Sequence, residues 1–320
     1  MTRTAVPAPV TKVFDAAGGW LPGAMAEVER RLERIAAEPG GPLADDATET
    51  LAAGGKRLRP LLVLLCAGPD GARSSLPAAV AVELVHMATL VHDDVLDDAP
   101  LRRGRPTVLA TSGRERATAT GDLLFSRAFA ELAEDGDRRR VEMLTMASVA
   151  LARGELAQRR DAFDLGVTAE RYLERCGLKT AALFECACAI GDPRSELAAF
   201  GRRVGLAFQL LDDVLDVTGP PERTGKARGT DLLDGTVTLP LIVARERDEV
   251  IAGTGLRSLD PATAESICDR IVATGAADEV REIARGYVAA AKADLEATDL
   301  DAERRRLLDL VADGVVERYA

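Results

Sequence analysis

Apolar residues recur three and four positions apart along most of the chain, as they do on the buried face of an amphipathic helix. One such stripe lies in residues 25–35, between charged neighbours. Alternating, strand-like runs are nearly absent, and Pro240 argues against a central strand in the partly β-branched run at 237–243. The pattern predicts an all-α fold of about ten or more helices. No linker composition divides the chain, so we expect residues 1–320 to form a single domain.

Three segments interrupt the helical pattern and predict loops. Residues 36–43 contain a Pro-Gly-Gly turn, residues 99–106 are basic and bounded by proline, and residues 218–236 are polar and glycine-rich. A loop as long as the third one is usually functional or mobile when it lies inside a compact domain.

The composition is that of a globular protein and narrows the class of partner. The 320 residues include 52 acidic and 41 basic side chains, and the net charge of −11 would repel a nucleic acid. No apolar run approaches the ~20 residues of a transmembrane segment, and the N-terminus lacks the apolar core of a signal peptide. The five cysteines are scattered without a CxxC pair, so neither a zinc site nor a disulfide framework is indicated. We expect a cytoplasmic protein.

Two aspartate-rich segments are the strongest chemical signal. HDDVLDD places Asp93 and Asp97 one turn apart on one helix face, and LDDVLDV repeats the spacing with Asp212, Asp213 and Asp216. A single acidic face is explained equally well by exposure to solvent. Two such faces across a cavity would require cations between them, and carboxylate-only ligands suit Mg²⁺, which also takes water and substrate phosphate.

Basic residues lie beside both aspartate segments. Lys56, Arg57 and Arg59 follow two glycines at a predicted helix start, a position that favours anions, and Arg102 and Arg103 follow the first aspartate segment. Further along the chain are Lys179, Thr180 and Lys226. Each one alone is more often an ordinary surface residue. Beside a predicted Mg²⁺ site, however, they indicate a substrate that carries a diphosphate.

The only two histidines, His86 and His92, fall in or near the first aspartate segment. His86 lies within about 20° of Asp93 and Asp97 around an ideal helix, which predicts a contact with the diphosphate. His92 lies off that stripe, so we predict a structural role for it.

The chain resembles the trans-isoprenyl diphosphate synthase family, also called the polyprenyl synthetase family. Six segments match the family in order and spacing: GGKRLRP, LVHMATLVHDDVLDDAPLRRGRPT, GDLLFSRAF, LKTAALFE, GLAFQLLDDVLDVTG and GKARGTDLLDGTVTLPL. The resemblance implies an isoprenoid-synthase-type helical bundle around a central cavity, assembled as a homodimer. It also implies Mg²⁺-dependent condensation of isopentenyl diphosphate with an allylic diphosphate, with three Mg²⁺ ions bound beside the diphosphate.

The resemblance assigns the metal site to the two aspartate segments. Asp93, Asp97 and Asp212 resemble the family's Mg²⁺ ligands, and Asp216 is counted with them at the metal site. Asp94 and Asp213 resemble residues that support such ligands through water or hydrogen bonds. The resemblance allows the same supporting role for Asp216. The catalytic residues that it implies are Asp93, Asp97, Asp212 and Lys179.

The same resemblance implies two diphosphate sites. The isopentenyl diphosphate side is implied to contain Lys56, Arg59, His86 and Arg103. The allylic diphosphate side is implied to contain Arg102, Lys179, Thr180, Gln209 and Lys226. One departure from the family is Gly235-Thr236, where a Gly-Lys pair is common. We expect Lys226 and Arg228 to take over the missing phosphate contact.

The implied reaction begins with loss of the allylic diphosphate, whose developing charge Mg²⁺ and basic residues stabilise. The isopentenyl double bond then attacks the carbocation, and a proton is lost. Closure of the 218–236 loop would exclude water.

The residues before Asp93 bear on product length. In the family, bulky residues one to three turns before this motif stop the growing tail, but Ala81 and Ala88 are small. Phe125 and Phe129 are candidate opposite walls. We therefore predict a product of C20 or longer.

Four alternatives remain open: a short-chain (C15) synthase, a class I terpene cyclase, a non-catalytic subunit that sets chain length, and a helical scaffold with acidic faces. The second DDxxD segment and GGKRLRP argue against a cyclase. The presence of both aspartate segments argues against a non-catalytic subunit.

Overall fold

We describe the protein from a computed structural model, which describes residues 8–102, 104–192, 194, 196–219 and 228–317. Within these residues the fold is helical apart from one short hairpin, as predicted. The helices are α1 (Ala8–Ala17), α2 (Trp20–Ala37), α3 (Gly41–Ala52), α4 (Leu58–Gly71), α5 (Leu76–Leu96), α6 (Val108–Asp135), α7 (Arg138–Asp161), α8 (Ala169–Cys176), the π-helix η1 (Gly177–Ala181), α9 (Ala182–Gly191), α10 (Ala198–Thr218), α12 (Thr230–Leu233), α13 (Leu239–Arg245), α14 (Glu249–Ala252), the 3₁₀-helix η2 (Leu256–Ser258), α15 (Pro261–Ala273), α16 (Ala276–Glu296) and α17 (Ala302–Glu317).

The amphipathic stripe predicted in residues 25–35 lies in α2 and is buried. Met25, Val28, Leu32 and Ile35 all face the core, and Met25, the most exposed of them, has an exposed fraction of 8%. Charged residues of the same helix face solvent, so the 3.6-residue period of the sequence determines which face is buried.

Helix α5 is apolar on nearly all sides and lies in the middle of the bundle. Buried residues occur along it from Ala78 to Val95, and it packs against α2, α4, α6 and α9. A helix that is hydrophobic all round belongs in a core, because no face of it gains from contact with water. Asp93 lies in the last turn of α5, so the packing of this helix fixes the position of its backbone.

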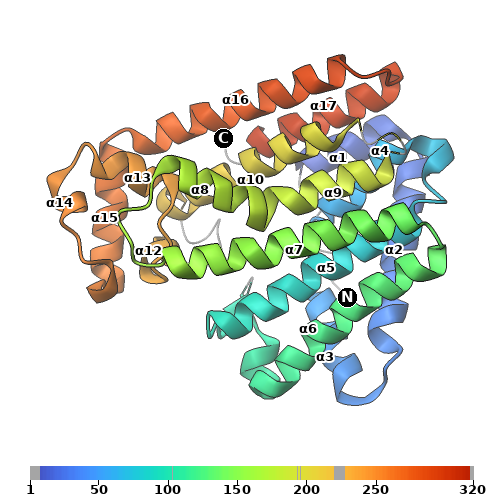
Figure 1. Cartoon of the computed structure of the whole chain (residues 1–320), viewed down its shortest axis with the longest axis horizontal. Coiled ribbons are helices and arrows are strands. Elements are labelled where there is room, and N and C mark those ends of the chain that lie inside the picture. Colours follow the sequence, from blue (N-terminus) through green and yellow to red (C-terminus); the bar gives the residue numbers. More distant parts are fainter. Residues whose placement is uncertain (1–7, 103, 193, 195, 220–227, 318–320) are drawn as a thin grey trace.

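The other long helices surround α5 and one another in a single bundle. Helix α10 packs on α9 and α16, α4 packs on α9, and α1 packs on α17. In Figure 1, α16 and α17 run along the upper edge, whereas α3 and α6 lie along the lower edge. One continuous cluster of buried side chains extends from α1 to α17.

The three predicted interruptions lie where helices end, but two of them contain short elements. Residues 36–43 include the turn between α2 and α3. Residues 99–106 form a two-stranded antiparallel hairpin, β1 (Leu101–Arg102) and β2 (Arg105–Pro106). Residues 228–236 contain the short helix α12, and residues 220–227 lie outside the described part of the chain. Pro240 starts helix α13 rather than interrupting a strand.

Two further observations bear on location and chemistry. No helix among the described residues is long and apolar enough to cross a membrane. All five cysteines are free and buried.

Candidate active site

The first aspartate segment ends helix α5. Asp93 lies in the last turn, and the backbone N–H of Asp97 caps the helix by donating to the carbonyl of Asp93 at 2.8 Å. Asp94 points elsewhere: it is buried, and its Oδ1 accepts a hydrogen bond of 2.7 Å from Nε of Arg102 on β1. Asp94 therefore fixes the hairpin, whereas Asp93 is half-buried and Asp97 is exposed.

In the second aspartate segment, in α10, the second carboxylate is again the buried one. Asp212 is exposed and Asp216 is partly buried, but Asp213 is buried. The hydroxyl of Tyr172 and Nε2 of Gln209 donate to the two carboxylate oxygens of Asp213, at 2.5 and 2.6 Å. In each DDxxD the second carboxylate is thus buried and hydrogen-bonded within the protein, whereas the first and third are less buried.

The π-helical turn η1 packs against α7 and α10 and carries the adjacent residues Lys179 and Thr180. Lys179 Nζ forms an ion pair with Oε2 of Glu155 on α7, and its charge acts on Asp93. The Thr180 hydroxyl donates to Oε1 of Gln209 on α10 at 2.6 Å. Single π turns occur frequently at functional sites because they shift the side-chain directions of a regular helix. Here one turn links the surroundings of both aspartate segments.

Two glycines allow η1 to lie close to its neighbours. A Cβ atom added at Gly154 of α7 would lie 2.5 Å from the backbone N of Lys179. A Cβ at Gly205 of α10 would lie 2.7 Å from Cα of Ala181. Both distances are shorter than any ordinary carbon contact, so a side chain at either position would displace the turn.

The carboxyl group of Asp93 is in an unusual electrostatic environment. Burial raises its pKa from 3.8 to about 6, an effect that Glu155 and Asp97 strengthen and that Lys179 and Arg102 oppose. A carboxylate that is costly to ionise gains from a bound cation, because the cation compensates for the lost hydration.

A chain of alternating charges leads away from Asp97. Nη2 of Arg159 on α7 lies 2.5 Å from Oδ1 of Asp97, and its Nε lies 3.0 Å from Oε1 of Glu155. The other oxygen of Glu155 pairs with Lys179. The order is therefore Asp97, Arg159, Glu155 and Lys179, with each carboxylate next to a basic group.

The segment GGKRLRP starts helix α4 as predicted, but its three basic residues differ. Arg57 caps the helix with a left-handed backbone (φ 46°), and its guanidinium pairs with Glu29 at 2.6 Å and Glu83 at 2.8 Å. Arg57 is therefore a structural residue rather than part of an anion site. The guanidinium of Arg59 lies 4.5 Å from the ring centre of Phe184, where cation–π attraction holds it.

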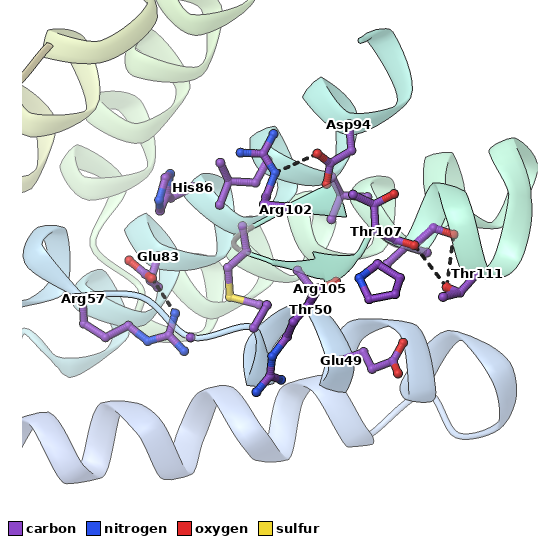
Figure 2. Close-up of a pocket in the computed structure, with 17 residues that line it drawn as sticks. Glu49, Thr50, Arg57, Glu83, His86, Asp94, Arg102, Arg105, Thr107 and Thr111 are labelled. Atoms are coloured by element: carbon purple, nitrogen blue, oxygen red, sulfur yellow. Dashed lines mark hydrogen bonds and ion pairs between the residues drawn. The ribbon is translucent and has the colours of Figure 1, made fainter. Parts of the chain in front are cut away.

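A pocket of about 160 Å³ lies beside these residues, between α3, α5, the hairpin and the start of α6. Figure 2 shows His86, Asp94 and Arg102 at this pocket, together with the Arg57–Glu83 pair. Two of the predicted diphosphate residues, His86 and Arg102, therefore line one hollow. Lys56 and Arg59 do not line it, although they belong to the segment that borders it.

His92, for which we predict a structural role, does not line this pocket. Its Nε2 is 3.2 Å from Oδ1 of Asp122 on α6. A Cβ at Gly121 would lie 2.3 Å from the same nitrogen, so α5 and α6 touch at this point.

The predicted site residues are not all brought together. Arg103 and Lys226 lie outside the described residues. Within the described residues, no three carboxylate, histidine or cysteine side chains approach closely enough to hold a metal ion. The outer carboxylates of the two segments supply the oxygen donors that Mg²⁺ prefers, so their chemistry fits the ion. Basic side chains also contact these carboxylates, as Arg159 does with Asp97.

Sequence reasoning missed three residues of this region: Glu155, Arg159 and Tyr172. Glu155 and Arg159 are four apart on α7, a spacing that predicts a pair but not its contact with Asp97. Tyr172 lies seven residues before Lys179, and nothing in that spacing predicts a bond to α10.

Comparisons with known proteins identify the relatives of this chain. The polyprenyl synthetase family profile matches residues 42–260. Heptaprenyl diphosphate synthase component 2 of Geobacillus stearothermophilus is 40% identical over 299 residues, which cover 89% of this chain and 93% of that protein. Geranylgeranyl diphosphate synthase of Methanosarcina mazei is 36% identical over 83% of this chain and 86% of that protein. The crystal structure of a Caulobacter crescentus polyprenyl synthase, complexed with calcium and isoprenyl diphosphate, has a TM-score of 0.87 at 33% identity, covering 99% of this chain and 100% of that chain.

Proposed function

Since the chain belongs to the polyprenyl synthetase family and is a prenyltransferase, we propose that it condenses isopentenyl diphosphate with an allylic diphosphate in a Mg²⁺-assisted reaction. The observation that carries this proposal is the π turn η1, in which the charge of Lys179 acts on Asp93 of α5 and the hydroxyl of the adjacent Thr180 donates to Gln209 of α10. Basic and hydroxyl groups next to two rows of carboxylates suit a diphosphate that is bound through metal ions.

The proposed metal ligands are the outer carboxylates of the two segments: Asp93, Asp97, Asp212 and Asp216. Bound Mg²⁺ would neutralise the diphosphate as it leaves the allylic carbon. Three ions per chain is the expected stoichiometry, which calorimetry with inorganic diphosphate checks. Support comes from the oxygen-only donors, from the raised pKa of Asp93, and from the calcium ion in the solved Caulobacter relative.

The protein's own residues hold and polarise the substrates. Lys179, Thr180 and Gln209, with Arg102 and Lys226, are proposed for the allylic diphosphate. Lys56, Arg59, His86 and Arg103 are proposed for isopentenyl diphosphate, and the pocket beside His86 supports this side. Fixed positive groups stabilise the charge that develops on the leaving diphosphate without having to reorganise. No protein nucleophile is needed, because the isopentenyl double bond attacks the carbocation.

We propose a product of C20 or longer, in line with relatives named geranylgeranyl and heptaprenyl diphosphate synthases. Ala81 and Ala88 on α5 are fully buried, so both lie inside the bundle. On α6, which packs along α5, the rings of Phe125 and Phe129 are 5.4 Å apart. The variant Ala88→Phe is expected to shorten the product. An unchanged product distribution in a folded variant would show that Ala88 does not border the growing tail.

We also propose that the single domain assembles as a homodimer. On α7, Met146, Val149 and Leu156 form an apolar stripe at helical spacing, with exposed fractions of 71%, 50% and 71%. Exposed apolar side chains that gather on one side of a surface helix are typical of an interface, although Arg153 lies among these three. The name component 2 of the Geobacillus relative raises the alternative of a second, different subunit. Light scattering of the purified chain distinguishes them: a dimer supports self-association, and a monomer contradicts it.

The deciding experiment compares three isosteric variants in a product assay with isopentenyl diphosphate and C5, C10, C15 or C20 primers. Asp93→Asn and Asp212→Asn are expected to lower turnover by orders of magnitude. Asp98→Asn is the matched control, because Asp98 belongs to the same segment but pairs with Arg114 at the surface. Wild-type rates in the first two variants would contradict the metal role. Cyclic products without consumption of isopentenyl diphosphate would instead indicate a terpene cyclase.

A further inference from the structure

The carboxylate of Asp97, a proposed metal ligand, is already bound to a basic side chain. Nη2 of Arg159 lies 2.5 Å from Oδ1 of Asp97, although 62 residues separate the two along the chain. The pair is only partly exposed, with exposed fractions of 39% for Arg159 and 35% for Asp97. It joins α7 to the end of α5, so it spans the edge of the candidate site.

Arg159 is held in this position from its other side. Its Nε lies 3.0 Å from Glu155, one turn earlier on α7, and Glu155 is fixed in turn by Lys179. An arginine that Glu155 already holds loses little further side-chain entropy when it contacts Asp97. Glu155 therefore orients the guanidinium of Arg159 toward Asp97, so the contact is not that of a freely rotating surface side chain.

We propose that Arg159 competes with Mg²⁺ for Asp97 and so sets the Mg²⁺ concentration that this enzyme needs. The proposal rests on the proposed function, because it requires Asp97 to be a metal ligand.

The physical argument concerns charge. A dication that binds Asp97 must displace the guanidinium or bind beside it, and the two positive charges repel at such short range. Arginine stays protonated at every physiological pH, so the competition does not disappear on deprotonation. The free energy of a part-exposed ion pair of this kind corresponds to about a fivefold change in the dissociation constant for Mg²⁺. Removing the guanidinium is thus expected to tighten Mg²⁺ binding, the opposite of what loss of a merely structural residue does.

The test is calorimetric titration of MgCl₂ into the full chain at constant ionic strength, with inorganic diphosphate present as the probe. Arg159→Gln is expected to bind Mg²⁺ about fivefold more tightly than the wild type. Arg160→Gln removes the same charge from the next position of α7, where the side chain is 70% exposed and lies 3.7 Å from Asp161. Its Mg²⁺ affinity is expected to equal that of the wild type.

Two further variants make the result specific. In an Asp97→Asn background, Arg159→Gln is expected to leave the Mg²⁺ affinity unchanged, because the site of competition is gone. Arg159→Lys keeps the charge but loses the planar fork, and we expect an affinity between those of the wild type and Arg159→Gln. This milder variant also tests the proposal if Arg159→Gln does not fold.

Three results would overturn the inference. An unchanged or weaker Mg²⁺ affinity in Arg159→Gln contradicts it directly. An equal tightening in Arg160→Gln, or one that persists without the Asp97 carboxylate, attributes the effect to overall charge. If the wild type shows no Mg²⁺-dependent heat with diphosphate, the proposed metal function fails together with this inference. If the wild type binds Mg²⁺ and forms product while Arg159→Gln binds no more tightly, this inference alone fails.

Discussion

The hydroxyl of Tyr172 on α8 donates a 2.5 Å hydrogen bond to Oδ2 of Asp213 on α10, and both side chains are buried. The hydrogen bonds continue from there: Nε2 of Gln209 donates to Asp213, and Oε1 of Gln209 accepts from the hydroxyl of Thr180. Burial raises the pKa of Asp213 well above its usual range, and the nearby Asp231 adds to this, whereas the bonds from Tyr172 and Gln209 oppose it. Tyr172 therefore helps to fix a side chain that the substrate is proposed to contact.

Removing this hydroxyl is expected to weaken the allylic side of the site. In Tyr172→Phe the ring remains, but Asp213 loses a hydrogen bond of a kind worth about 1.5–3 kcal/mol. We expect turnover to fall about tenfold and KM for the allylic diphosphate to rise, with KM for isopentenyl diphosphate unchanged. Tyr287→Phe, at a partly buried position of α16, is the control. Equal kinetics for the two variants would contradict this role of Tyr172.

A side chain at Gly154 is expected to displace the π turn. The added Cβ of Gly154→Ala would lie 2.5 Å from the backbone N of Lys179 and 2.8 Å from its Cα. Overpacking of this kind costs about 1–3 kcal/mol, so we expect a lower melting temperature and at least a tenfold loss of turnover. Gly286→Ala on α16 is the matched control, because nothing lies within 4 Å of its new Cβ. It is expected to be neutral or stabilising by about 0.5–1 kcal/mol. Full activity of Gly154→Ala would argue against a fixed position for Lys179.

The pH dependence of Mg²⁺ binding is expected to follow Asp93. Its pKa of about 6 in the folded chain exceeds the ordinary 3.8 because burial disfavours the charged form. Because the folded chain binds this proton more tightly than the unfolded chain does, protonation of Asp93 favours the folded state. This contribution to the free energy of unfolding is fully present below pH 3.8 and is lost as the pH rises through about 6. Mg²⁺ binds the ionised form, so the increase in melting temperature caused by Mg²⁺ is expected to be larger at pH 7.5 than at pH 5.5. In Asp93→Asn this difference should vanish, and a Mg²⁺ effect that is equal at both pH values in the wild type would rule out Asp93.

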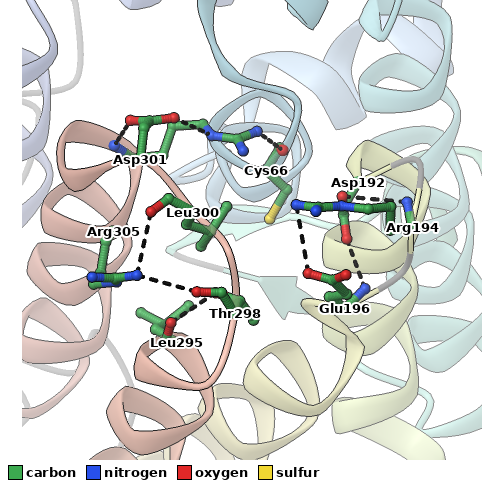
Figure 3. A network of polar contacts seen from close by, with 10 residues as sticks. Cys66, Asp192, Arg194, Glu196, Leu295, Thr298, Leu300, Asp301 and Arg305 are labelled. Carbon is green, nitrogen blue, oxygen red and sulfur yellow. Dashed lines mark hydrogen bonds and ion pairs between the residues drawn. The ribbon is translucent and has the colours of Figure 1, made fainter.

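The start of α17 is expected to stabilise the kink in α4. Gly68 interrupts α4 with a left-handed backbone (φ 71°), and Nη1 of Arg304 donates to the carbonyl of Cys66 at 3.1 Å. Asp301, which Figure 3 labels near Cys66, accepts from Nε of Arg304 at 2.8 Å. Arg304→Ala is expected to lower the free energy of unfolding by about 1–3 kcal/mol, read as a lower urea midpoint.

Arg306→Ala serves as the control for Arg304→Ala, because Arg306 is exposed on the same helix. Equal urea midpoints for the two variants would show that the contact with Cys66 does not stabilise the kink.

The helices and the aspartate positions followed from the sequence because they depend on local periodicity. The stripe of α2, the start of α4 after two glycines and the aspartates at the ends of α5 and α10 all arise from spacing along one helix. Thr180 and Gln209, which are 29 residues apart and both predicted for the allylic side, are joined by a hydrogen bond.

Other features depend on contacts between distant segments, which spacing does not encode. Arg57 looked equivalent to Lys56 and Arg59, but Glu29 and Glu83 bind its guanidinium. Likewise Asp212 and Asp213 are adjacent and chemically identical, and only the rotation of α10 in the bundle buries one of them. The contact of Arg159 with Asp97 is of the same kind, because it requires α7 to lie beside the end of α5.

The single-turn element η1 has a mechanical consequence. Its five residues, Gly177–Ala181, are wedged between α7 and α10, with no room at Gly154 or Gly205 for them to slide. A shift of one neighbouring helix is therefore transmitted through the backbone of this turn to the other. The first row of carboxylates is joined to α7 through the contact of Arg159 with Asp97, so a shift of that row would reach α10 by way of α7 and this turn.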